Sequence, residues 1–99
     1  MRWLAKRRLA DVSLQLVRAR EDLRIAGEQS GSLDDEADDA RIRAMVSDSP
    51  MDAHDHRHAQ GPADAMLREQ QRLRHLVATL ARRQDDLLDE LAAATKDRT

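Results

Sequence analysis

Apolar residues recur along the first half of the chain at alternating steps of four and three residues. This heptad spacing belongs to a helix that buries one face against another helix. It excludes a strand, in which side chains alternate with a period of two. We therefore expect one long helix over residues 2–47, with its repeat at Ala5, Leu9, Val12, Leu16, Ala19, Leu23, Ala26, Ser30, Leu33, Ala37, Ala40 and Ala44.

The second half of the chain carries the same spacing. It predicts a second helix over residues 50–94, with a frayed tail at 95–99. Its repeat runs through Ala59, Ala63, Met66, Gln70, Leu73, Val77, Leu80, Gln84, Leu87 and Leu91. The large apolar members of both repeats form the predicted interaction seam, which comprises Leu9, Val12, Leu16, Leu23, Leu73, Val77, Leu80, Leu87 and Leu91.

A short segment, Ser47-Asp48-Ser49-Pro50, separates the two repeats. The residue before a proline avoids helical backbone, and Ser49 can cap a new helix that has Pro50 first and Asp52 third. A tight connection makes the two helices antiparallel, so residues whose numbers add to about 98 should face each other. The prediction is an all-α, coiled-coil-like antiparallel hairpin that turns near residues 48–50, in a single domain over residues 1–99.

Two segments interrupt the helical pattern. Residues 27–32 contain two glycines, each of which costs a helix about 1 kcal/mol relative to Ala, and Ser32 with Asp35 resembles the capping box of a helix start. The heptad phase continues through this segment, which favours one long helix, kinked at 27–31, over a turn. At residues 61–62 an interior proline costs about 3 kcal/mol, and either a kink or a new helix that starts at Pro62 fits the pattern.

Further large apolar residues lie outside the seam and would stay partly exposed on a lone hairpin. A soluble monomer seldom exposes that much apolar surface. We therefore expect a homodimer of hairpins, a four-helix assembly, while the direction in which the two copies dock stays open. The residues concerned are Leu4, Leu14, Val17, Ile25, Ile42, Met45, Leu67, Leu76 and Leu88.

Four segments of the chain resemble an uncharacterised group of small Ala/Arg-rich helical proteins from high-GC bacteria. The resemblance covers most of the chain and implies a helical hairpin and no known activity. This chain departs from the group by its glycines at 27, 31 and 61, a difference that bears on helix continuity. The segments are Trp3-Leu-Ala-Lys-Arg-Arg-Leu9, Glu36-Ala-Asp-Asp-Ala-Arg-Ile-Arg43, Ala63-Asp-Ala-Met66 and Arg83-Gln-Asp-Asp-Leu-Leu-Asp-Glu-Leu91.

Charge is distributed unevenly within a formal net charge of -2. Residues 1–26 carry seven basic and three acidic side chains, residues 27–58 carry three basic and nine acidic ones, and residues 59–99 carry seven of each. Contact of the basic end with phosphate or anionic lipid is conceivable, and the acidic run offers a docking surface for a basic partner, but a solvated helix face is the favoured interpretation of both. The basic end is Arg2, Trp3, Lys6, Arg7 and Arg8, and the acidic run is Asp34, Asp35, Glu36, Asp38 and Asp39.

Three histidines follow the turn, at positions 54, 56 and 58. His54 and His58 are one helical turn apart, a spacing that can chelate Zn²⁺ or Ni²⁺, with Asp52 or Asp55 as a helper. Two histidines make only half a site, and the plainer interpretation is a solvated polar turn of helix. We therefore predict no metal site and no cofactor, with His54 and His58 as weak candidates.

The residue types limit chemistry and location. The chain contains no cysteine, which excludes disulfides, cysteine-type zinc sites and thiol nucleophiles and fits a reducing cytosol. Uncharged runs fall far short of the ~20 apolar residues of a membrane span, and the start lacks the apolar region of a secretion signal. Motifs for nucleotide binding, zinc proteolysis and serine hydrolysis are absent. We expect a cytoplasmic protein that is not an enzyme and makes no membrane contact.

The leading hypothesis is a non-enzymatic helical scaffold or adaptor that acts through self-association and through contacts with an unknown protein partner. The alternative is a nucleic-acid- or RNA-polymerase-associated regulator that uses the basic end or the carboxylates of Asp48 and Asp52 at the hairpin tip. The polymerase form of this alternative rests on a resemblance of the hairpin tip to transcription factors that insert a helical hairpin into the polymerase secondary channel, whose flanking residues and second domain this chain lacks. Nucleic-acid contact by the basic end is not favoured, because the patch is short, it holds the one aromatic residue of the chain, and the net charge is negative.

Overall fold

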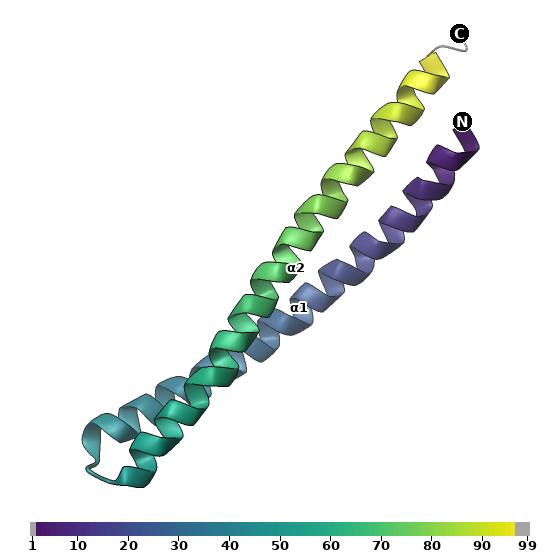
Figure 1. The fold of residues 1–99 in the computed structure, drawn as a ribbon. Coiled ribbons are helices and arrows are strands. Elements are labelled where there is room, and N and C mark those ends of the chain that lie inside the picture. The colour runs from purple at the N-terminus through teal and green to yellow at the C-terminus, as the bar shows by residue number, and fades with distance from the viewer. Residues whose placement is uncertain (1, 97–99) are drawn as a thin grey trace. The chain divides into compact units, whose positions relative to one another are not determined.

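The computed structural model describes residues 2–96, and two helices account for all of these residues except a short connection. Helix α1 spans Arg2–Val46 and helix α2 spans Pro50–Lys96 (Figure 1). Residues 47–49 join the helices, and residues 2–96 contain no strand. The predicted all-α helical hairpin is therefore confirmed, with its turn at the predicted place.

Contacts divide the hairpin into two compact units. The terminal unit combines α1 up to Asp22 with α2 from Leu73 onward, and the turn unit is Leu23–Arg72. Each unit contains a segment of α1 beside an antiparallel segment of α2 (Figure 1). The side chains buried between the two helix segments differ in size between the units.

Leucine and valine dominate the core of the terminal unit. Leu16 is 1% exposed, and burial of one such side chain contributes about 1.5–3 kcal/mol. Gln84 Nε2 of α2 donates a hydrogen bond of 3.0 Å to Ser13 Oγ of α1, which places the two helices within one residue of the predicted register. The core is Val12, Leu16, Ala19, Leu80 and Leu87, with Leu9, Leu76, Val77 and Ala81 half-buried against it.

Small side chains close the turn unit instead. A Cβ built at Gly27 would meet Gln70 Nε2 of α2 at 3.4 Å, so the same antiparallel register holds in this unit. The half-buried Leu23, Leu33 and Met66 are larger residues of the heptad repeats in this unit. Its fully buried residues are Ala26, Ser30, Ala37, Ala40 and Ala63.

The turn forms as its sequence predicts. The Ser49 N–H donates to Ser47 Oγ at 3.0 Å, and Ser49 Oγ accepts from the Met51 N–H at 3.3 Å. The Ala53 N–H donates to the Ser49 carbonyl at 3.3 Å, which closes the first turn of α2. Ser49 is thus the N-cap, and Pro50 occupies the first helical position, where its missing N–H costs nothing.

Replacement of this cap should weaken the hairpin measurably. We expect Ser49→Ala to lower the free energy of unfolding by about 1 kcal/mol, because an orphan backbone N–H loses its acceptor. Urea unfolding followed by far-ultraviolet circular dichroism measures the change. Ser49→Asp keeps an acceptor and should match the wild type, whereas equal stability of the alanine variant would refute the capping role.

Both segments that disturb the helical pattern lie inside continuous helix. Helix α1 runs through residues 27–32, so the favoured prediction of one long helix is confirmed and the alternative helix start at Ser32 and Asp35 is wrong. Helix α2 runs through Pro62, so the alternative of a new helix that starts at this proline is wrong. The heptad-repeat residues before and after each segment are buried or half-buried. We infer that their packing outweighs the local cost of glycine and proline in a helix. Gly31, Gly61 and Pro62 themselves are exposed, and a Cβ built at Gly31 or Gly61 would meet nothing within 4 Å.

The helix ends differ slightly from the predicted ones. Helix α1 stops at Val46 rather than at Ser47, and α2 continues to Lys96 rather than to Ala94. The Thr95 hydroxyl donates to the Leu91 carbonyl at 2.9 Å, which ties Thr95 to the preceding turn of α2. The predicted fraying is therefore wrong for residues 95–96, and the rest of that prediction lies outside the described residues.

Candidate functional site

The predicted interaction seam joins α1 to α2 within the chain. Leu16, Leu73, Leu80, Leu87 and Val12 are buried, and the other members are half-buried. Leu23 belongs to the turn unit, and the remaining seam residues belong to the terminal unit. Because the hairpin itself covers these side chains, a contact surface for another molecule has to lie on its outer faces.

Two pairs of large apolar residues are exposed on α1. Leu14 and Val17 in the terminal unit are 52% and 62% exposed, and Ile42 and Met45 in the turn unit are 50% and 74% exposed. In each pair the residues are three positions apart, so they are neighbours on one face of the helix. We call them the Leu14 pair and the Ile42 pair. Ile25, Leu67 and Leu88 are exposed as well, whereas Leu4 and Leu76 are half-buried.

The hairpin tip is more apolar than the sequence analysis suggests. Val46 is 81% exposed and Met51 is also exposed, on either side of residues 47–49. Asp48 is exposed, whereas Asp52 is half-buried in the first turn of α2. Val46 and Met51 could have been identified from the sequence, because they lie directly beside the predicted turn, where no facing helix remains to cover them.

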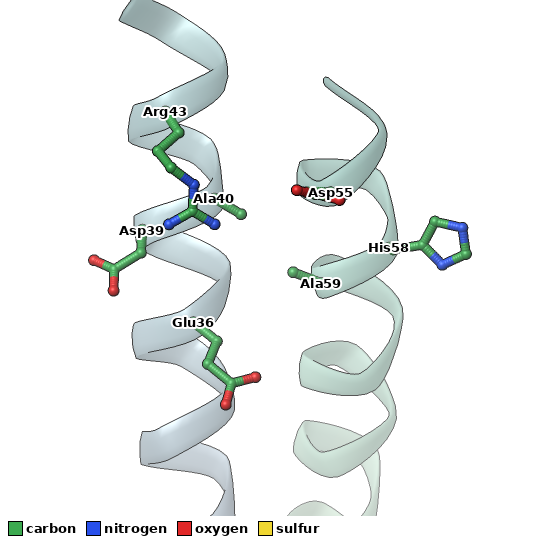
Figure 2. A pocket seen from close by; sticks show the side chains of 7 residues that line it. All are labelled: Glu36, Asp39, Ala40, Arg43, Asp55, His58 and Ala59. Atoms are coloured by element: carbon green, nitrogen blue, oxygen red, sulfur yellow. The ribbon is translucent and has the colours of Figure 1, made fainter. Parts of the chain in front are cut away.

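A hollow of about 340 Å³ lies between the helices of the turn unit. It forms where the small side chains of Ala40 and Ala59 face each other (Figure 2). Glu36 and Arg43 of α1 flank Ala40, and Asp55 reaches from α2 toward α1. The register predicts that Arg43 and Asp55 face each other, so that this charged rim could have been found from the sequence.

Two further residues line this hollow but point elsewhere. The carboxylate of Asp39 points away from α2, and the imidazole of His58 points away from α1 (Figure 2). The hollow therefore offers a mixed charged rim over two alanines, without a converging set of ligands. Such a rim can accept water or a polar side chain.

The histidines do not gather with other metal ligands. The rings of His54 and His58 lie 4.2 Å apart and are tilted by 55°, as expected for exposed side chains one helical turn apart. His56 is half-buried, and its Nδ1 is shielded from solvent without a hydrogen-bond partner. Within residues 2–96, no group of three or more histidine, cysteine, aspartate or glutamate side chains is placed to hold a metal ion.

The charged segments are solvated helix faces. At the basic end Trp3, Lys6, Arg7 and Arg8 are exposed and Arg2 is half-buried. The acidic run is exposed in the interior of α1, far from any helix N-terminus. The helix-dipole stabilisation that an N-terminus gives to carboxylates therefore does not apply to it.

Ion pairs form along single helices. Arg24 pairs with Glu28 at 2.7 Å, and Arg41 lies 3.9 Å from Asp38. Hydrogen bonds from Arg72 at 2.6 and 2.9 Å hold the pKa of the Glu69 carboxyl below its usual value. Exposed pairs such as these add little to stability.

Comparisons with known proteins gave no match. No protein-family model matches it, and neither a curated protein nor a solved structure shows significant similarity to it. The resemblance to small Ala/Arg-rich helical proteins stays a prediction. Within residues 2–96, neither helix has an apolar stretch long enough to cross a membrane.

Proposed function

We propose that this protein is a non-enzymatic helical scaffold or adaptor, which pairs with a second copy of itself and presents the outer faces of its hairpin to a protein partner. The exposure of the Leu14 pair and the Ile42 pair carries the proposal. The seam already covers the apolar faces that the hairpin needs for its own folding. The pairs remain as surplus apolar surface, which in soluble proteins marks interaction sites when it is contiguous.

The surroundings of the two pairs support contacts between proteins over catalysis. The hollow of the turn unit has a charged rim over two alanines, whereas substrate pockets are mostly apolar with a few convergent polar groups. We place the protein in the cytoplasm as part of the same proposal, because a chain without cysteine suits a reducing compartment.

Sedimentation equilibrium on three proteins tests the self-association. The wild type should sediment as a dimer at micromolar concentration. Val17→Asp should raise the dissociation constant at least about tenfold, because a charge would enter an apolar contact. Gln15→Asp adds the same charge at an exposed polar position nearby and should leave the dissociation constant unchanged.

The test also requires that folding is intact. Both variants change exposed residues, so their far-ultraviolet circular dichroism should equal that of the wild type. A wild type that sediments as a monomer throughout would refute self-association. Salt-dependent retention of that monomer on DNA would favour the nucleic-acid-associated alternative, in which the basic end makes the contact.

A further inference from the structure

We propose that the two copies dock head to tail, with the Leu14 pair of one α1 packed against the Ile42 pair of the other α1. This inference rests on the self-association proposed above and adds its direction. It joins the terminal unit of one copy to the turn unit of the second copy. Apolar spacing, charge and interface size each bear on it.

The two pairs are suited to each other in spacing. Leu14 and Val17 are three residues apart, as are Ile42 and Met45, and the second pair follows the first at a distance of four heptads. Each pair presents two neighbouring apolar side chains outside the seam. When two helices pack antiparallel, such i and i+3 neighbours can interdigitate, which places Val17 beside Ile42 and Leu14 beside Met45.

Charge decides the direction. Residues 2–22, which form the α1 part of the terminal unit, carry six basic and three acidic side chains, whereas residues 23–46, the α1 part of the turn unit, carry three basic and six acidic ones. Parallel docking would set each excess against itself, and like charges brought together disfavour an interface. Head-to-tail docking sets the basic segment of each copy against the acidic segment of the other.

Interface size bears on the number of contacts. A stable protein interface buries about 1,200–2,000 Å², so a dimer that makes the contact twice comes nearer to that size than one that makes it once. A two-fold axis uses the same contact twice and stops the assembly at two copies. The paired charges around both contacts also make the dimer sensitive to salt, because the screening length falls from about 10 Å at 0.1 M to about 3 Å at 1 M.

Disulfide trapping tests the direction, because the chain has no cysteine of its own. Full-length Val17→Cys is mixed with full-length Ile42→Cys that carries a tag, and the mixture is oxidised mildly at micromolar concentration. Head-to-tail docking predicts that the mixed disulfide exceeds the background at least about tenfold, since paired thiols have millimolar effective concentration. A mixture of Val17→Cys with Glu90→Cys, at an exposed position of α2, measures that background.

The outcomes separate this inference from the proposed function. Mixed disulfide above background, together with a dissociation constant of the dimer that is higher at about 1 M salt than at about 0.1 M salt, supports the head-to-tail dimer. Disulfides between two Val17→Cys chains above background, with the mixed product at background, refute it in favour of parallel docking. A dimer that gives only background products refutes the contact and leaves self-association standing. A monomer in sedimentation removes both.

Discussion

Replacement of Leu16 by Asp should unfold most of the protein. Leu16 is 1% exposed at the centre of the terminal-unit core, among Val12, Ala19, Leu80 and Leu87. Loss of a buried leucine side chain alone costs about 2–5 kcal/mol, and the buried carboxylate adds a further penalty because no partner is there to pair with it. A small domain has only about 5–15 kcal/mol of stability in total.

Far-ultraviolet circular dichroism measures the loss of helix, and sedimentation measures the loss of self-association. Leu73→Asp should behave in the same way, because Leu73 is 3% exposed on α2 in the same unit. Leu14→Asp is the matched control, since it makes the same chemical change two residues away at a side chain that is 52% exposed. The control should retain its helicity. Equal helicity of all three variants and the wild type would show that the seam does not hold the helices together.

Replacement of Pro62 by Ala should stabilise the protein by up to about 3 kcal/mol, the cost of a proline in a helix interior. Pro62 is exposed within α2, so an alanine side chain creates no clash at this position. The new N–H can donate to the carbonyl of His58, one turn earlier, which lacks this donor in the wild type. For a domain of this size the midpoint of thermal unfolding should rise by up to roughly 12–24 °C.

Gly61→Ala provides the matched control for the proline. Gly61 is exposed and a Cβ there meets nothing within 4 Å, so the substitution should add only about 1 kcal/mol of helix propensity. Thermal unfolding followed by circular dichroism compares the two variants. A gain for Pro62→Ala no larger than that for Gly61→Ala would mean that α2 already compensates for the missing hydrogen bond.

The heptad spacing predicts most of this fold because two-helix packing leaves few choices. Because both halves of the chain carry a face repeated at steps of four and three residues, the two helices can bury these faces against each other, and a tight turn leaves only the antiparallel order. Ser49 and Pro50 then determine where α2 begins, through a side-chain acceptor and a fixed backbone angle. The contacts from Ser13 to Gln84 and from Gly27 to Gln70 follow from the same register.

Residues 27–32 and Pro62 were harder to predict because local and long-range terms oppose each other there. Glycine and proline disfavour helix locally by about 1 and 3 kcal/mol. The neighbouring seam residues gain only if the helix continues, and the size of that gain depends on how closely the facing helix packs. The sequence does not contain that quantity directly, so the continuing heptad phase indicates the result for residues 27–32, and at Pro62 the sequence leaves both alternatives open.

The outer surfaces follow from the sequence in part. The position of Ile42 and Met45 outside the repeat predicts their exposure, whereas exposure of Val46 and Met51 depends on where the facing helix ends. The hollow at Ala40 and Ala59 depends on unfilled volume. A linear pattern of residue types indicates which faces pack together and says little about gaps between them.

The buried side chains of the turn unit are smaller than those of the terminal unit, and this difference has a consequence for motion. Separation of α1 from α2 in the turn unit exposes mainly methyl groups and one hydroxyl at the fully buried positions, Ala26, Ser30, Ala37, Ala40 and Ala63. That exposure carries a much smaller hydration penalty than exposure of Leu16 or Leu80, because the penalty scales with apolar area. Brief, reversible separation of the two helices should therefore begin in the turn unit, while the helices of the terminal unit stay packed. Such separation is a sub-global fluctuation of the folded chain.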